Sequence, residues 1–420
     1  MLTLITFITC YALFAIFGSW RAVIAVTGAL LLLFSGVVNL HQAVTELIYW
    51  NVVALFLGTV ILAEIFMQSR MPAVIAEWFV DKAPTARSAI IIVCLLSSFL
   101  SAFVENVAVV LIVAPITITL CNKVGISPVR PIIFLAMFSN VQGTATLIGD
   151  PPSMILGGYM KMGFNDFFFY QGKLSIFFIV QVGAIAATFF VAWILRDIKS
   201  PISLIPVETP RSYIPSLTLI FFVIGLAFGS KFDPDFKWFA GTYALFLAVV
   251  LSIWYELKAR WTTFSILLRQ LDWDTTFFLT GLFILVGALK KAGWIDMLSF
   301  HLAQILDHDL AITFIAIIVI SIVISAFVDN VPYLLTMIPV VQNIADTQGH
   351  PITLLVFALL VGSCLGGNIT PIGATANIVA VGILQKEGHP ISFGRFVKYG
   401  LPFTLIAVTA SGLTLWFIWS

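Results

Sequence analysis

Charged residues are scarce in this sequence: Asp, Glu, Lys and Arg together make up 10% of its 420 residues, whereas 60% are hydrophobic. Soluble domains carry about 25% charged residues, so this composition excludes an ordinary soluble protein and indicates an integral membrane protein. The formal net charge of +1 also excludes the basic balance typical of nucleic-acid-binding proteins. We therefore expect contact with membrane lipid and no nucleic-acid partner.

Cysteine and enzyme motifs are equally sparse. The four cysteines lie in or beside apolar runs without paired spacing, which predicts small buried residues and no disulfide framework. The motifs HExxH, GxSG and GxGD are absent, which argues against an intramembrane hydrolase, and no Walker motif indicates an ATP-driven pump. We expect no enzymatic activity and no cofactor.

Long apolar runs fill most of the chain, and their lengths predict an all-α polytopic protein with about ten full crossings. Residues 2–17 lack the basic region of a signal peptide and are interpreted as the first membrane helix. Residues 71–80 alternate too irregularly to span and are expected to form an interfacial helix.

Two apolar runs are interrupted by helix-breaking residues: GTATLIGDPP at Gly143–Pro152 and GNITPIGATA at Gly367–Ala376. Gly and Pro weaken a helix, and irregular backbone survives at membrane depth only where protein or a polar cavity covers it. We therefore predict two broken crossings, at residues 132–159 and 352–384. Broken helices at matching places in two halves are the best sequence indication of a transporter's binding site.

Two further runs, residues 88–122 and 310–345, are too long for one crossing and carry polar residues in their middle. We interpret each as a re-entrant helical hairpin that enters and leaves on one side, with the first tip near residues 103–107. Two full crossings joined by a tight turn are the alternative.

The two halves of the chain resemble each other at a fixed spacing. A shift of 224 residues places SAFVENVAVVLIVAPI on SAFVDNVPYLLTMIPV with eight of 16 positions identical, and it also places Gly143 on Gly367. This predicts a first repeat at 1–195, a cytoplasmic linker at 196–212 and a second repeat at 213–420. Lys and Arg divide fifteen to six between the two sides, which orients the repeats in inverted fashion with both termini outside.

These paired stretches resemble the signatures of the ion transporter superfamily over nearly the whole chain. The nearest groups are the ArsB-type arsenite permeases and the NhaD-type sodium/proton antiporters, with a citrate-transporter-like domain, and the divalent anion/sodium symporters are more distant. The symporters carry Ser-Asn-Thr at each tip, where this sequence has Glu105-Asn106-Val107 and Asp329-Asn330-Val331. The departure weakens any transfer of a carboxylate substrate. The resemblance implies an elevator-like transporter that is often a homodimer.

Acidic residues inside apolar segments are rare and indicate ion pathways or proton relays. Glu105 and Asp329 occupy matching positions at the two tips, each followed by Asn, and the alternative is that they only cap helix N-termini. Asp150 could cap the re-formed half-helix or act in the site, and Glu64 is expected to snorkel.

The predicted ion or substrate site comprises oxygen-bearing and glycine positions from both tips and both broken helices, namely Glu105, Asn106, Gly143, Thr144, Thr146, Asp150, Asp329, Asn330, Gly367, Asn368, Thr370 and Asn377. Within this set, Na⁺ could lie at Asn106, Gly143, Asn330 and Gly367. The two glycines are expected to allow close approach of the backbone to a bound ion, because glycine has no Cβ and accepts positive φ at little cost.

The combined features predict a secondary active transporter of the cell membrane that moves a small inorganic ion or anion coupled to H⁺ or Na⁺. A sodium/proton antiporter is the alternative within this class. An ion channel is the alternative from another class, because only saturation and counter-transport distinguish it from a carrier.

Overall fold

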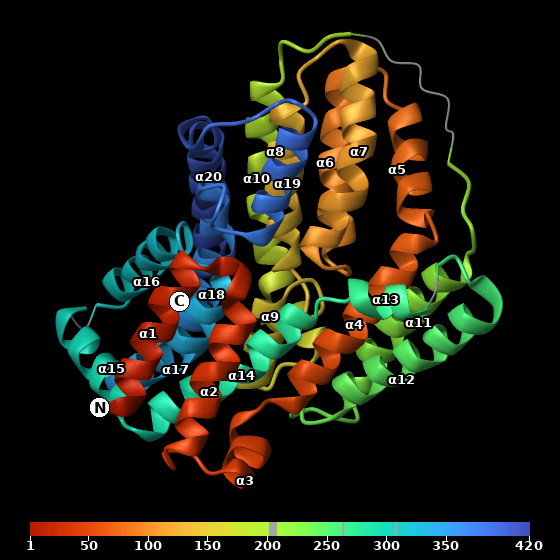
Figure 1. The fold of residues 1–420 in the computed structure, drawn as a ribbon. Coiled ribbons are helices and arrows are strands. Elements are labelled where there is room, and N and C mark those ends of the chain that lie inside the picture. The colour runs from red at the N-terminus through yellow and green to blue at the C-terminus, as the bar shows by residue number, and fades with distance from the viewer. Residues whose placement is uncertain (201–207, 263, 307–308) are drawn as a thin grey trace.

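The computed structural model describes residues 1–200, 208–262, 264–306 and 309–420, which are almost wholly helical (Figure 1). A short antiparallel ribbon joins β1 (Phe169–Tyr170) to β2 (Lys173–Leu174). Short 3₁₀ and π segments link several helices: η1 (Gly18–Trp20), η2 (Ala43–Leu47), η3 (Phe164–Phe167), η4 (Tyr255–Ala259) and η5 (Gly367–Ile369).

The helices of the first half are α1 (Leu2–Ile16), α2 (Arg21–Phe34), α3 (Leu40–Gln42), α4 (Trp50–Gln68), α5 (Met71–Asp81), α6 (Ala86–Ser101), α7 (Asn106–Val124), α8 (Val129–Gly143), α9 (Pro151–Met160) and α10 (Ile176–Ile194). Those of the second half are α11 (Ile214–Gly229), α12 (Phe239–Trp254), α13 (Phe264–Gln270), α14 (Trp273–Lys291), α15 (Trp294–Ile305), α16 (Leu310–Ser325), α17 (Asn330–Gln348), α18 (Ile352–Gly366), α19 (Thr375–Lys386) and α20 (Phe393–Trp419).

Seven of the described helices are long and apolar enough to cross a membrane: α4, α7, α10, α12 with η4, α14, α18 with η5, and α20. Shorter apolar helices, among them α1, α6, α11 and α16, lie beside them. The chain is therefore an integral, multi-pass, all-α membrane protein, as its composition predicts. The count of ten full crossings and the cytoplasmic linker, of which residues 201–207 lie outside the described part, stay predictions.

Each predicted hairpin corresponds to a pair of helices joined by a short turn. The turn at residues 102–105 joins α6 to α7, and the turn at 326–329 joins α16 to α17. Both hairpins end at glycines 224 residues apart, because Gly125 (φ 70°) and Gly349 (φ 71°) adopt the left-handed conformation that stops α7 and α17. The repeat is thus visible in local geometry, whereas the inverted orientation of its copies in a membrane stays a prediction.

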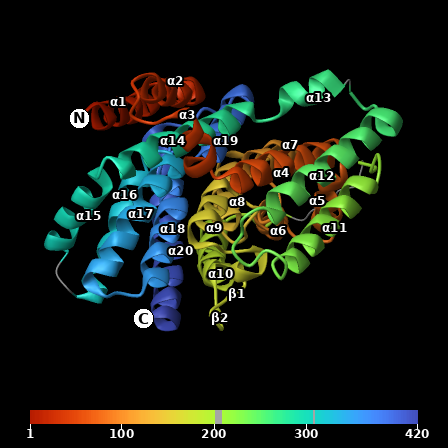
Figure 2. The same ribbon diagram turned by 90° about the horizontal axis from the view of Figure 1, so that it is seen from below.

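The helices pack into two bodies that each draw on both halves of the chain. In the flanking body, as we call it, α4 packs along α12, α2 packs along α14, and α1 and α11 lie against them. In the hairpin body, the pairs α6–α7 and α16–α17 pack with α8, α9, α10, α18, α19 and α20. Figure 2 shows α11 and α12 on one side of the molecule and α15, α16 and α17 on the other.

Glycines allow the flanking body its closest helix crossings. A Cβ on Gly58 of α4 would lie 2.6 Å from the backbone of Ala244 on α12, and a Cβ on Gly281 of α14 would lie 2.7 Å from the backbone of Ala25 on α2. Small residues at such crossings are typical of membrane helices, whose association depends on close van der Waals packing. Gly58 and Gly281 are 223 residues apart, so the same crossing occurs once in each half.

Candidate functional site

A cavity of about 340 Å³ lies where the two bodies meet. Its wall from the flanking body includes Arg21 at the start of α2, Glu64 of α4, and Asp272 and Thr275 at the start of α14. Its wall from the hairpin body is formed by both hairpin tips, by α8 and by the starts of α9 and α19. Segments far apart in the sequence therefore form one cavity that holds charged and amide side chains inside an apolar protein.

The two predicted tip acids line this cavity and also cap the helices that follow them. The Glu105 carboxylate accepts a hydrogen bond from the backbone N–H of Ala108 (3.1 Å), and the Asp329 carboxylate accepts one from Val331 (3.0 Å). The capping interpretation is therefore correct for both acids. Capping does not use the full hydrogen-bonding capacity of these acids, because each carboxylate has a second oxygen and lines the cavity.

Asp150 brings a third carboxyl group to the same place from the broken crossing. Its extended backbone precedes α9, whose first residue is a proline, but its side chain makes no capping hydrogen bond. The residue instead lines the cavity together with Asn106 and Asn330, one from each tip, and only 9% of it is exposed. The structure thus places Asp150 between the two hairpins and not in the role of a cap.

The interruptions of α8–α9 and α18–α19 are held to the hairpin tips by threonine hydroxyls. Thr146 donates to the carbonyl oxygen of Ala102, and Thr370 donates to that of Ala326. Both pairs are related by the 224-residue shift. Because these hydroxyls already donate to backbone, they position the tips and do not line the cavity.

Neither Gly143 nor Gly367 lies among the residues with positive φ. These glycines are needed because a side chain at either position would collide with neighbouring protein atoms. A Cβ on Gly143 would lie 2.3 Å from the Oδ1 atom of Asn106, and one on Gly367 would lie 2.6 Å from the carbonyl oxygen of Gly373. The close approach is to protein atoms of the tip and of the broken helix.

The twelve predicted site residues therefore divide into two groups. The cavity wall contains Glu105, Asn106, Asp150, Asp329 and Asn330. Behind the wall lie Gly143, Thr144, Thr146, Gly367, Asn368, Thr370 and Asn377. The four predicted Na⁺ positions are split between these groups, so Na⁺ binding at all four together is not favoured by the geometry.

Comparison with known proteins places the chain. A family model described as "Citrate transporter" matches residues 11–362. The chain belongs to this family. An uncharacterized transporter of Mycobacterium tuberculosis is 30% identical over 435 residues, which cover 99% of this chain and 98% of that protein. The predicted membership of the ion transporter superfamily is confirmed, and the chain is a transporter, not an enzyme; closeness to arsenite permeases stays a prediction.

Two solved structures share the fold of this citrate transporter family member. The YdaH transporter of Alcanivorax borkumensis has a TM-score of 0.59 at 14% identity, with 87% of this chain and 84% of that one covered. MtrF of Neisseria gonorrhoeae has a TM-score of 0.59 at 12% identity, with 92% and 83% covered. Identities this low support the fold alone.

An asparagine that the sequence analysis did not single out connects the two halves behind the cavity. The side-chain amide of Asn140 on α8 donates to the Oδ1 atoms of Asn368 (2.8 Å) and Asn377 (3.1 Å) and accepts from Asn106 (3.4 Å). Asn377 in turn donates to the carbonyl oxygens of Gly367 and Thr370 at 3.0 Å each. These amides hold one broken helix against the other.

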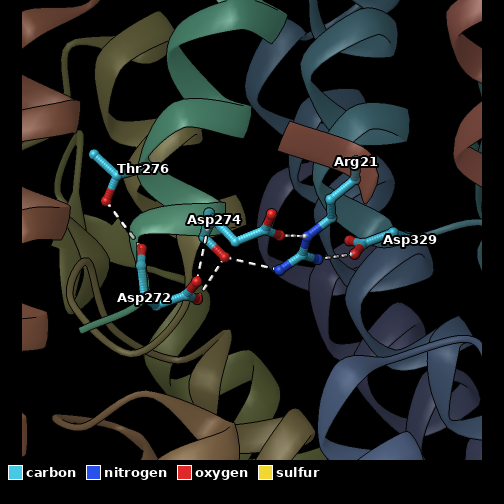
Figure 3. Close-up of polar contacts among 6 residues, drawn as sticks. Arg21, Asp272, Asp274, Thr276 and Asp329 are labelled. Atoms are coloured by element: carbon cyan, nitrogen blue, oxygen red, sulfur yellow. Dashed lines mark hydrogen bonds and ion pairs between the residues drawn. The ribbon is translucent and has the colours of Figure 1, made fainter. Parts of the chain in front are cut away.

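Arg21 and its partners on α14 were not among the predicted site residues, because Arg21 contributed only to the count of basic residues on each side. Its guanidinium donates to Asp274 (2.9 Å), to Thr275 (2.8 Å) and to Asp329 (2.8 Å), as Figure 3 shows for the two acids. Asp272 caps α14 by accepting from the backbone N–H of Thr275 (2.9 Å). No feature of the sequence indicates that a residue near position 21 meets one near position 329.

Carboxyl groups outnumber cations in the described wall of the cavity. Five acids line it, namely Glu64, Glu105, Asp150, Asp272 and Asp329, against the single guanidinium of Arg21. Glu64 also accepts a hydrogen bond from Gln68 (2.9 Å) and lines the cavity, and its snorkelling to an interface stays a prediction. An excess of carboxylates in a chamber of low dielectric favours a bound cation or protons.

Proposed function

We propose that this protein is a secondary active transporter that moves a small inorganic ion or anion across the membrane, coupled to H⁺ or Na⁺. The observation that carries the proposal is the position of Asp150. Asp150 belongs to a broken helix, is 9% exposed, and lines the cavity together with the asparagines of both hairpin tips. A buried acid that both moving hairpins can contact is suited to carry the coupling ion.

The division into two bodies supports alternating access by an elevator-like movement. The hairpin body contains both tips and both broken helices, whereas the flanking body supplies the opposite wall of the cavity. A shift of the hairpin body along α4 and α14 would carry Glu105, Asp150 and Asp329 together. We also propose a homodimer, with contacts through the flanking body, because that body would then stay fixed in the membrane.

The acidic wall favours a sodium/proton antiporter as the second candidate. The guanidinium of Arg21 is already paired with two carboxylates, so the described wall offers an anion no unpaired cationic side chain. An anionic solute would therefore enter with a cation or after protons bind. A sodium/proton exchanger would need no anion site.

Asp150→Asn tests the proposal, because it keeps the side-chain volume and removes the ionisable group. The protein is reconstituted in proteoliposomes that contain a pH-sensitive dye, with three probes tested separately: a Na⁺ gradient alone, citrate, and arsenite. Wild-type protein should couple at least one probe to H⁺ or Na⁺, and Asp150→Asn should abolish that coupling. The matched control is Asp197→Asn, an exposed acid paired with Arg130 far from the cavity.

The three probes also separate the candidates. Proton movement driven by Na⁺ without citrate or arsenite would favour the antiporter, and saturable, gradient-driven uptake of one anion would favour the solute transporter. Wild-type coupling in folded Asp150→Asn protein would overturn the proposed role of Asp150. Flux that neither saturates nor exchanges with solute on the opposite side would favour a channel.

A further inference from the structure

The guanidinium of Arg21 joins the two bodies at the edge of the cavity. Two of its three hydrogen-bond partners, Asp274 and Thr275, lie on α14 of the flanking body, and α2 itself packs along α14. The third partner, Asp329, lies at the tip of the second hairpin, 2.8 Å from the Nη1 atom of Arg21. Figure 3 shows the guanidinium reaching between Asp274 and Asp329.

This geometry makes Arg21 a fixed part of the flanking body and Asp329 its movable partner. If the second hairpin withdrew, the guanidinium would keep its contacts with Asp274 and Thr275. Asp329 would keep its cap of Val331, because that bond uses its other oxygen. The Arg21–Asp329 bond is thus the one contact of the cluster that a relative movement of the bodies would break.

The first half of the chain contains the neutral counterpart of this cluster. The 223-residue shift that relates Trp50 to Trp273 places Asn51 on Asp274. Asn51 also binds the start of the helix beside it: it donates to the carbonyl oxygen of Phe236 (2.8 Å) and accepts from the backbone N–H of Gly241 on α12 (2.7 Å). Among the described residues, the hydrogen-bond partners of the Asn51 side chain are backbone groups, whereas Asp274 binds the side chain of Arg21.

The two hairpin tips therefore differ in the way they meet the flanking body. Asp329 is ion-paired to Arg21, whose side chain is 18% exposed. Glu105, the matching acid of the first tip, has no ion-pair partner among the described residues. Two repeats that share their local geometry thus contribute an engaged tip and an unengaged tip to the same cavity.

We propose that Arg21 is a state-specific latch that holds the second hairpin tip against the flanking body in the conformation of this structure. The latch opens when the hairpin body moves, so Arg21 sets the balance between this conformation and the opposite one. Arg21 acts here as a positioning residue. The inference deepens the proposed transport function, but its test needs no transported ion.

A cysteine pair across the two bodies reports the conformation. The rings of Tyr49, before α4, and Tyr159, on α9, stack with centroids 5.0 Å apart. Tyr49→Cys/Tyr159→Cys is introduced into protein whose four native cysteines, all buried, are replaced. The initial rate of cross-linking by a short bis-maleimide then measures how often the bodies adopt the present arrangement, in purified protein without substrate.

Arg21→Gln should lower this rate severalfold, because the rate follows the fraction of molecules in the present conformation. Asp329→Asn should lower the cross-linking rate similarly. It removes the same ion pair from the other side, so the test does not depend on correct folding of the arginine variant alone. Arg21→Lys should keep more of the rate than Arg21→Gln, because it keeps a cation between Asp274 and Asp329. Arg130→Gln is the control, because Arg130 pairs with Asp197 within the hairpin body and its loss should change nothing.

The latch is overturned if folded Arg21→Gln and Asp329→Asn both cross-link at the wild-type rate, or if Arg21→Lys cross-links no faster than Arg21→Gln. This outcome is distinct from failure of the proposed function. If Arg21→Gln loses cross-linking but Asp150→Asn keeps wild-type coupling, the role of Asp150 is refuted and the latch stands. If Arg21→Gln and Asp329→Asn cross-link at the wild-type rate but Asp150→Asn loses coupling, the latch is refuted and the role of Asp150 stands.

Discussion

Replacing Asn140 with cysteine tests whether the amide cluster behind the cavity stabilises the contact between the two halves. Cysteine is the natural choice because the 224-residue shift places Asn140 on Cys364. The substitution removes two donated hydrogen bonds, of 2.8 Å to Asn368 and 3.1 Å to Asn377, and one longer bond of 3.4 Å from Asn106. It leaves three polar atoms without their present partner.

Two scales give different magnitudes for this loss. Orphaned buried groups cost about 1–3 kcal/mol each in soluble proteins, which would total roughly 3–9 kcal/mol. Polar contacts between membrane helices average only about 0.6 kcal/mol each. The lower scale applies more closely here, because Asn140 borders the polar cavity and Asn377 keeps its bonds to Gly367 and Thr370. We expect a loss of about 2 kcal/mol.

Reversible unfolding in mixed micelles of increasing SDS content measures the free energy of unfolding. Asn140→Cys is compared with Cys364→Ala, which removes a buried thiol whose hydroxyl contact with Ser363 is long, 4.0 Å. The control should lose clearly less than the asparagine variant. A free energy of unfolding within about 0.5 kcal/mol of wild type for Asn140→Cys, the usual scatter for a neutral surface change, would refute the reasoning.

Two further predictions concern packing and paired amides. Gly143→Ala should cost about 1–3 kcal/mol of stability and reduce transport, because its Cβ would lie 2.3 Å from Asn106. Gly382→Ala is the control in the same thermal stability assay, because a Cβ there meets open space and should be neutral. Equal stability of the two variants would contradict this prediction. The side-chain amides of Gln142 and Gln181 donate to each other at 2.7 and 2.8 Å, so Gln142→Leu should cost about 1 kcal/mol of unfolding free energy. In a double-mutant cycle, the variant with leucine at both positions should regain most of that free energy. Simple additivity of the two single changes would argue against the pair.

The sequence was sufficient for the helices and for the interruptions, because apolar length and helix-breaking residues act locally. The turn at residues 102–105 and the break at 144–150 lie where polar residues interrupt apolar runs. Asp150 and the two tip acids were found by the same reasoning, since an acid in an apolar segment is costly. Asn140 carried that signal too, as an amide in an apolar run, and could have been found.

The pairing of residues distant in the sequence could not be predicted. Arg21 reaches Asp329 only because α2 packs on α14, and no local pattern encodes that packing. The bond of the Thr146 hydroxyl to the tip could not be predicted for a similar reason, because a hydroxyl could serve an ion or a backbone carbonyl equally well. Only the position of Ala102 decides for the carbonyl.

The interleaved packing of the halves has a consequence for biosynthesis. Helix α8 packs on α19, α10 on α20, and α4 on α12, so both bodies wait for helices of the second half, and the hairpin body waits for the end of the chain. At about 5–20 residues per second, the second half takes roughly 10–40 s to synthesise. During that time Asn140 and Asp150 lie in the membrane without their later partners. Insertion factors that shelter polar helices should therefore bind the nascent first half, and two separately expressed halves should be able to assemble after synthesis.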